Sequence, residues 1–299
     1  MTPDDNNPLP PALSGSSELP GTSESAPMSV PVSLGQDASP PPAPKLAADL
    51  QVPWNWFDLL LLAGLYLGGG LLLAKFVVRS FGIAGVNMTQ LRKSASEQSF
   101  FAIVVELLLD GALLAYLAAQ VRLYFGLPFW RTIGWRRLET GTTPRALAYL
   151  GLLGGGLLFS MLIQISSAAF APKTKLPIEN FFQDRRSAIL LMLMAVIVAP
   201  VIEETIFRGY VYPVLARRFG ATCGILVTGT IFGLLHAAQL WGGWGQIGLL
   251  ILVGIVFTAV RAATRTVVAS YLLHVSYNSF IFIAFIVASH GFRNFPAGH

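Results

Sequence analysis

Ionisable and amide side chains lie at three points within apolar stretches of the C-terminal half of the chain. They are Glu203, Glu204, Arg208, His236, His274 and Asn278. A charged group in a bilayer costs at least about 2.5–3.5 kcal/mol on insertion scales, so each one needs a partner or a function. A carboxylate and an imidazole with little water around them are suited to taking a proton from a reacting water.

The spacing of these residues favours a common site. Glu203 lies 17 residues before Gly220 and His236 lies 16 residues after it, and glycine can end a helix. If both arms are helices of an antiparallel hairpin, the two side chains lie at one depth, about 25 Å from the turn. Phe232 shares a helix face with His236. Pro200 would loosen the helix beside Glu203 and free backbone groups there.

Helical spacing also assigns partners within the groups. Glu204 and Arg208 are one turn apart and can form a neutralising ion pair that braces the helix. Glu203 is rotated by about 100° around the helix from Glu204 and can face a different partner. His274 and Asn278 share a face and form a two-donor patch suited to a developing oxyanion. Each group alone has a structural explanation, as an ion pair, a satisfied buried histidine or interhelical hydrogen bonding, but together they favour a site.

The composition shows what must hold these residues in place. The chain is 54% hydrophobic and 12% charged, with a mean hydropathy of +0.62. That is about half the charge of a soluble domain, so a soluble globular enzyme is excluded and a multi-pass membrane protein is expected. The single Cys223 excludes a disulfide framework and a cysteine zinc site. The chain beyond residue 50 is basic. This fits cytoplasmic loops rich in Lys and Arg better than it fits nucleic-acid binding.

Seven apolar runs are long enough to cross a bilayer, which takes about 20 residues. The sequence therefore predicts an all-α, polytopic membrane helical bundle of about seven transmembrane helices, in the plasma or inner membrane. All six tryptophans lie outside the centres of these runs, as interfacial aromatics do. The runs are about 57–78, 98–121, 146–171, 187–218, 221–240, 243–260 and 266–289.

The chain divides into four predicted parts. Residues 1–52 form a disordered, acidic Pro/Ser-rich tail, since the first 50 residues hold 11 of the 19 prolines and no periodic apolar pattern. N-terminal transmembrane helices follow over 53–180, a catalytic helical core over 181–290 and a C-terminal tail over 291–299. The Pro-rich tail is a candidate ligand for a protein partner, although a solvated spacer is the simpler interpretation.

Seven spans would place the loops 122–145, 217–220 and 261–265 on the same side as the N-terminal tail. Apart from Arg208, which lies within a span, the Lys and Arg residues beyond residue 50 then divide nine against nine between the two sides. The positive-inside rule therefore does not choose an orientation.

Three short patterns carry a family resemblance. They are E-E-x-x-x-R at 203–208, F-x-x-x-H at 232–236 and H-x-x-x-N at 274–278. They resemble the three motifs of the CPBP intramembrane proteases, a family that contains the type II CAAX prenyl endopeptidases and bacterial bacteriocin-processing or self-immunity proteins. The resemblance covers about residues 187–285, and residues 1–180 carry no part of it.

The resemblance implies hydrolysis of a peptide bond inside the membrane. By match to the motifs, Glu203 would be the general base that activates water, assisted by His236. His274 and Asn278 would stabilise the tetrahedral oxyanion. The residues that would support the site are Glu204, Arg208 and Phe232. The implied partners are the lipid bilayer and a membrane-associated peptide or protein, and nothing in the sequence identifies a prenyl pocket.

A metal is left open by the sequence. Glu203, His236 and His274 could bind one Zn²⁺ with water at the open position. However, H-E-x-x-H is absent and Asn278 is a poor zinc ligand, so a metal-free water activated by glutamate is equally consistent.

Two other functions compete with proteolysis. One is a non-catalytic membrane scaffold or bacteriocin self-immunity protein on the same fold. The other is a transporter or proton-coupled channel that uses Glu203 with Glu106 and Asp110, which lie one turn apart in the second run. These two acids could approach the site, bind a proton or cation, or face a polar crevice.

Overall fold

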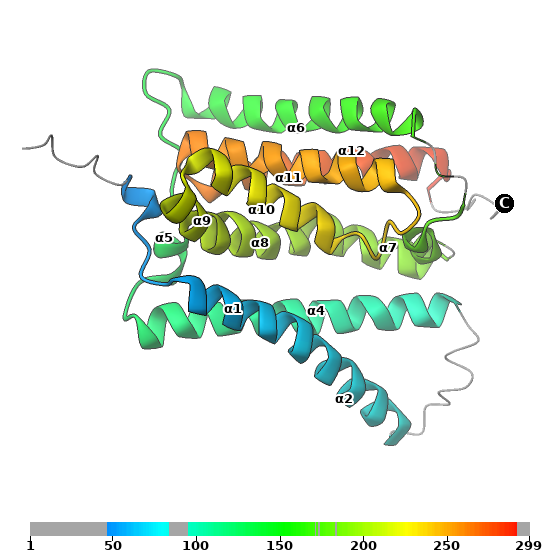
Figure 1. Cartoon of the computed structure of the whole chain (residues 1–299). Helices are drawn as coiled ribbons and strands as arrows, with labels where there is room; N and C mark the ends of the chain where they lie inside the picture. Colours follow the sequence, from blue (N-terminus) through cyan, green and yellow to red (C-terminus); the bar gives the residue numbers. More distant parts are fainter. Residues whose placement is uncertain (1–46, 84–94, 171, 173, 183, 292–299) are drawn as a thin grey trace, which may run out of the picture. The chain divides into compact units, whose positions relative to one another are not determined.

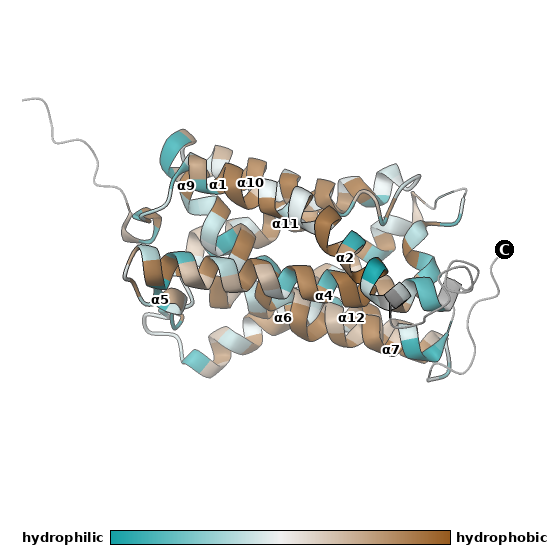
Figure 2. Cartoon of the chain, turned by 90° about the horizontal axis from the view of Figure 1, so that it is seen from below, coloured by the Kyte–Doolittle hydropathy of each residue, from teal (hydrophilic) through white to brown (hydrophobic). Residues whose placement is uncertain are grey.

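A computed structural model of the chain describes residues 47–83, 95–170, 172, 174–182 and 184–291. The described residues form helices joined by turns, without a strand. Six of these helices are long and apolar enough to cross a membrane, and Figure 2 shows their apolar middles and the more polar ends. The predicted helical membrane bundle is therefore confirmed. The six spans are Trp56–Ser80, Glu97–Tyr124, Arg145–Ala168, Arg185–Phe219, Trp244–Thr264 and Val267–Ala288.

Several spans consist of consecutive helical segments of different type (Figure 1). The segments in chain order are η1 (Ala48–Leu50), α1 (Trp56–Gly64), η2 (Leu65–Gly69), α2 (Gly70–Ile83), α4 (Ala95–Ala119), η3 (Gln120–Tyr124), α5 (Phe129–Ile133), α6 (Arg145–Ala168), η4 (Pro177–Phe182), α7 (Arg185–Leu193), η5 (Met194–Val198), α8 (Ala199–Glu203), η6 (Glu204–Val211), α9 (Tyr212–Phe219), α10 (Ala221–Leu235), α11 (Trp244–Thr264) and α12 (Val267–Ala288).

The fifth predicted run is shorter than a membrane span. Helix α10 has 15 residues and is about 22 Å long at 1.5 Å per residue, less than the bilayer core. It ends at Leu235, and turns over 236–242 replace the helix that the sequence predicts up to 240. Among the described residues, the six membrane-length helices are thus accompanied by the shorter α10, and His236 directly follows its C-terminal end.

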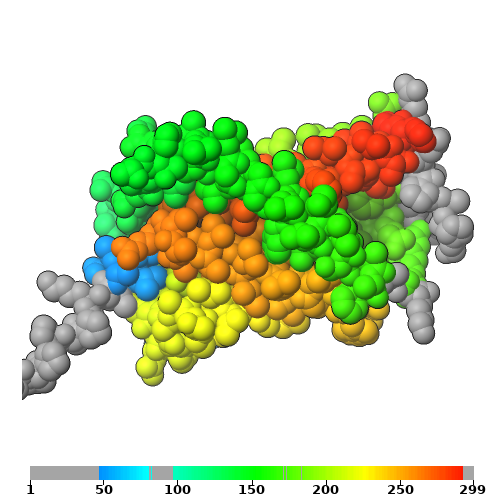
Figure 3. Space-filling view, turned by 90° about the horizontal axis from the view of Figure 1, so that it is seen from above, coloured from blue at the N-terminus to red at the C-terminus, as the bar shows by residue number. Residues whose placement is uncertain are grey.

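The hairpin predicted at Gly220 is present. Gly220 has a positive φ of 85° and ends α9, and α10 packs antiparallel beside it. Helix α10 also approaches α11 closely, because a Cβ at Gly233 would lie 2.7 Å from the backbone nitrogen of Ile251. Small residues at such a contact let two membrane helices pack closely. Figure 3 shows another face, where α6, in green, covers α12.

The helix that carries Glu203 changes its hydrogen-bond register on both sides of that residue. The π-helical segments η5 and η6 flank α8. At the end of η5 the Ala199 N–H bonds to Met194 O, five residues back. The next bond of that register would join residue 200 to Ala195 O, but Pro200 has no N–H. The freed carbonyl predicted beside the site is therefore Ala195 O.

The segment before α1 is packed on the end of the bundle formed by α9, α10 and α11. Arg217 donates to the carbonyls of Val52 and Trp54 over 2.7 and 2.9 Å. Asp49 forms an ion pair of 2.7 Å with Arg261. These contacts place the loops near 217–220 and 261–265 at the end where α1 begins, as the sequence predicts. The parts of the two predicted tails before residue 47 and after residue 291 lie outside the described residues.

Candidate active site

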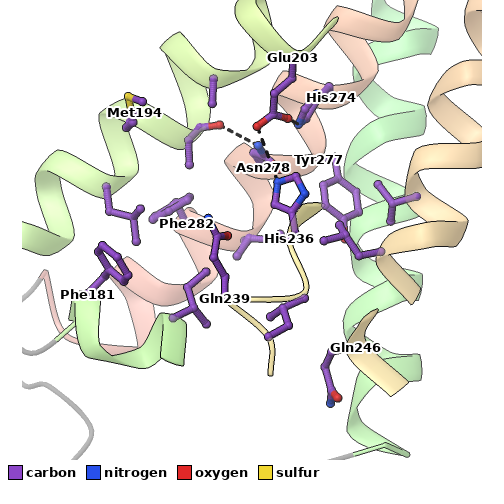
Figure 4. Close-up of a pocket in the computed structure, with 18 of the residues that line it drawn as sticks. Phe181, Met194, Glu203, His236, Gln239, Gln246, His274, Tyr277, Asn278 and Phe282 are labelled. Carbon is purple, nitrogen blue, oxygen red and sulfur yellow. Dashed lines mark hydrogen bonds and ion pairs between the residues drawn. The ribbon is translucent and has the colours of Figure 1, made fainter. Parts of the chain in front are cut away.

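A cavity of about 500 Å³ lies among the helices, and all four predicted catalytic residues line it (Figure 4). Glu203 is the last residue of α8, His236 follows α10, and His274 and Asn278 lie one turn apart on α12. Three segments that are distant in sequence therefore bring these side chains to one wall.

Glu203 lies between the two imidazoles. Its Oε1 is 3.8 Å from His236 Nε2, and its Oε2 is 3.7 Å from His274 Nε2. Both distances are longer than a hydrogen bond but short enough for electrostatic interaction. The side chains of Glu203 and His236 are 22% and 24% exposed, whereas His274 is 4% exposed. A small reactant can therefore reach the carboxylate from the cavity.

The end of α10 fixes the ring of His236. The His236 amide bonds to Gly233 O instead of continuing the α-helical pattern to Phe232 O. The Phe232 carbonyl is 2.8 Å from Nδ1 of the ring. Because a carbonyl only accepts, Nδ1 carries the proton, and Nε2 faces Glu203. Phe232 thus supports the site through its backbone, and its ring packs against the rings of both histidines.

Glu204 is fully buried and has two partners. Its Oε1 is 2.9 Å from Arg208 Nη1, which is the predicted ion pair, and 2.9 Å from His274 Nδ1. Arg208 also donates to Gly254 O over 3.0 Å. The carboxylate fixes the Nδ1 proton of His274 and directs Nε2 toward Glu203. The sequence predicted the pair with Arg208 but not the bond to His274.

Asn278 uses one of its amide protons for structure. Its Nδ2 donates to the freed Ala195 carbonyl over 2.7 Å. One N–H of the same amide nitrogen is left for another acceptor. The predicted two-donor patch of His274 and Asn278 therefore lines the cavity, but His274 Nδ1 and one N–H of Asn278 are already bonded to other groups.

The cavity also includes residues outside the three motifs. Glu106 and Asp110 of α4 line it, which favours the first of the three interpretations of these acids. Tyr277 lines it as well, and its place three residues after His274 on a helix was the signal available in the sequence. Most of the further lining residues are apolar, among them Phe181, Phe182, Met194 and Phe282, and a few are Gln or Ser.

The predicted metal ligands do not converge on one point. Glu203 turns one oxygen to His236 and the other to His274, and His274 Nδ1 is bonded to Glu204. In the part of the chain that the structure describes, no group of three His, Cys, Asp or Glu side chains is arranged to hold a metal ion. The donor set does not fit a zinc centre.

Together, fold and site define a helical integral membrane protein with a carboxylate held between two histidines at a cavity. Residues 185–280 match the model of a family described as type II CAAX prenyl endopeptidase Rce1-like. This segment, about a third of the chain, is similar to that family of membrane endopeptidases. The resemblance drawn from the three motifs is thus confirmed. Comparison with curated proteins gives no match, and comparison with solved structures gives none.

Proposed function

We propose that the protein is an intramembrane endopeptidase that cleaves a membrane-associated substrate with a water activated by Glu203 and His236. The observation that carries this proposal is the placement of Glu203 between two Nε2 atoms at 3.8 and 3.7 Å, on the wall of a cavity within apolar helices. The matched family has the same general activity. A scaffold would have no need of this arrangement.

In the proposed reaction, the water oxygen attacks the carbonyl carbon of the peptide bond. The Glu203 carboxylate takes the proton of the water, while Nε2 of His236 accepts a hydrogen bond from it. The proton then passes to the amide nitrogen as the carbon–nitrogen bond breaks, which yields a carboxylic acid and an amine. No side chain acts as a nucleophile, so no covalent intermediate forms.

The oxyanion that forms in this step would be bound by α12. The second N–H of Asn278 can donate to it directly, since the other is held by Ala195 O. His274 can donate from Nε2 when its ring carries both protons, because Nδ1–H is bonded to Glu204. Glu204 is thus proposed as a positioning residue for His274, in addition to its ion pair with Arg208.

The lining of the cavity supports an apolar substrate segment. A volume of about 500 Å³ is within the range of ligand sites in proteins, and much of the wall is aromatic or aliphatic. CAAX-like processing of a prenylated protein at the plasma or inner membrane is one form of this proposal.

The test compares membrane peptides released by the wild type and by Glu203→Gln, which keeps the shape of the side chain. Cleavage should fall at least about a hundredfold, since general base catalysis contributes 10²–10⁴-fold, and His236→Ala should do the same. Glu139→Gln, which changes an exposed acid outside the cavity, is the matched control. Full cleavage by Glu203→Gln would refute the assignment of the base.

Cleavage should also continue after chelation of metal ions. The donor set around Glu203 does not converge on a metal position, and the proposed step uses only side chains and water. Metal analysis of the purified protein together with cleavage in a strong zinc chelator checks this expectation. Loss of activity that added zinc restores would contradict it.

A further inference from the structure

A groove on an exposed face of α4 is separate from the candidate active site. It has a volume of about 310 Å³ and lies between the end of α4 with η3 and the short helix α5 beside it (Figure 2). We call it the α4–α5 groove. It shares no lining residue with the cavity around Glu203. Its lining includes Gly111, Ala115, Ala118 and Arg122 from α4 and η3, and Phe129 and Trp130 from α5.

The groove extends over the depth of one lipid leaflet. Its lining residues on α4 are three or four positions apart, so it follows one face of the helix. The span runs over Glu97–Tyr124, which places Gly111 near its middle and Arg122 near its end. Arg122 lies 11 residues after Gly111, or about 16 Å, and the hydrocarbon core is about 30 Å thick. A transmembrane helix of a partner would cross both leaflets, so this length favours a lipid chain.

The groove is apolar along its length and cationic at its outer end. All of its lining residues except Arg122 are apolar or aromatic. Among the interactions that the described residues make, Arg122 has no hydrogen bond, ion pair or ring contact. Tyr124 and Trp130 beside it are 79% and 46% exposed, and exposed Tyr and Trp are typical of the level of lipid headgroups. The free guanidinium therefore lies where an acyl chain in the groove would join its headgroup.

The charge at this end of the bundle favours an anionic headgroup. Six other arginines are exposed there, and Glu139 is the one exposed acid of this end in the described part of the chain. The six are Arg131, Arg136, Arg137, Arg145, Arg218 and Arg265. A guanidinium can bind a phosphate through two parallel hydrogen bonds, and further basic residues attract anionic lipids. We propose that the α4–α5 groove binds one acyl chain of an anionic phospholipid whose phosphate is bound by Arg122.

Lipid binding by the full chain tests this proposal independently of the protease function. The purified protein is freed of lipid in detergent and titrated with phosphatidylglycerol or with phosphatidylcholine of the same acyl chains, and native mass spectrometry counts the bound lipid. The wild type should bind one phosphatidylglycerol at least about fivefold more tightly, the factor for one basic residue at an anionic membrane surface. Arg122→Gln should lose this preference. Arg218→Gln, which changes an exposed arginine of the same end outside the groove, should keep it.

A second pair of variants tests the acyl chain. Gly111→Phe fills the groove, and a Cβ at this position meets no atom within 4 Å, so the protein should still fold. It should weaken the binding of both lipids at least about tenfold, because several CH₂ groups lose their contact. Gly151→Phe, at an exposed glycine of α6 with equally open space, is the matched control and should bind like the wild type. Inorganic phosphate should not displace the lipid, because it has no chain to fill the groove.

Three results would overturn the proposal. Equal binding of the two lipids by the wild type, or an equal loss of preference in Arg122→Gln and Arg218→Gln, would assign the attraction to the basic end as a whole. Displacement by inorganic phosphate, or unchanged binding by Gly111→Phe, would leave an anion at Arg122 without a chain in the groove. A dimer in the same spectra that Gly111→Phe dissociates would show that a second copy of the protein covers this face.

Discussion

Neighbouring carboxylates have different tasks in this site, because one step along a helix turns a side chain by about 100°. Glu203 faces the cavity, and Glu204 is fully buried against Arg208 and His274. The sequence predicted this division and the pair between Glu204 and Arg208. It could not predict the bond to His274, because the spacing within one segment contains no information on the rotation of α12 against η6.

Removal of Glu204 should separate its structural role from its role as a positioning residue. Glu204→Ala leaves the fully buried Arg208 without its anion, which costs about 3–5 kcal/mol of unfolding free energy. Glu204→Ala/Arg208→Leu removes both charges and should recover part of that loss. Cleavage should stay low in both variants, since His274 Nδ1 has lost its acceptor. Unfolding in detergent and kcat/KM measure the two effects, and a double variant with wild-type activity would show that Glu204 does not position His274.

At the scale of the elements, the sequence predicted the helices more securely than their ends and registers. Gly220 correctly predicted the hairpin, because a positive φ is a local property. The run after it continues in apolar residues to 240, but α10 ends at Leu235. Hydropathy indicates which side chains are buried, and a side chain can be buried in a helix or in a packed turn. An apolar run therefore does not show where the helix ends. The ring of His236 then finds the Phe232 carbonyl, a contact that only the ended helix allows.

The freed Ala195 carbonyl gives a test at this scale. Asn278→Leu removes its donor and should destabilise the protein by about 1–3 kcal/mol, the cost of an unpaired buried acceptor. Adding Pro200→Ala supplies an N–H at residue 200 that can complete the register, so the double variant should regain stability. If Asn278 also binds the oxyanion, cleavage stays reduced in the double variant. Wild-type cleavage there would assign Asn278 to the helix contact alone.

For the whole molecule, the scarcity of charge correctly predicted a membrane bundle, since a bilayer tolerates few charged groups. The count of loop charges was less informative. Arg217 and Arg261 are both counted as loop cations of one side. In the structure, however, both are bonded to the segment before α1. Residues 47–52 of that segment were predicted as part of the tail, because a short stretch without periodicity does not reveal which distant arginine it contacts.

The same contacts predict where the chain can be shortened. A chain that starts at residue 45 keeps Asp49, Val52 and Trp54 and should cleave like the full chain. A chain that starts at residue 56 leaves Arg261, which is 1% exposed, without Asp49. It also removes the fully buried Trp54, whose ring stacks on Tyr210 at 4.7 Å. Tyr210 and Arg217 continue the span that carries Glu203, so disorder at this end reaches the base.

The shorter chain should lose at least about 3 kcal/mol of unfolding free energy, the cost of a deleted buried tryptophan or of an unpaired buried charge, and cleavage should fall with it. Asp49→Asn in the full chain isolates the ion pair from the tryptophan. Thermal unfolding in detergent and peptide cleavage are measured on the same preparations. Stability and cleavage should be highest for the full chain and the chain that starts at residue 45, lower for Asp49→Asn, and lowest for the chain that starts at residue 56. Equal stability of the chain from 56 and the full chain would mean that the segment before α1 does not hold the end of the Glu203 span.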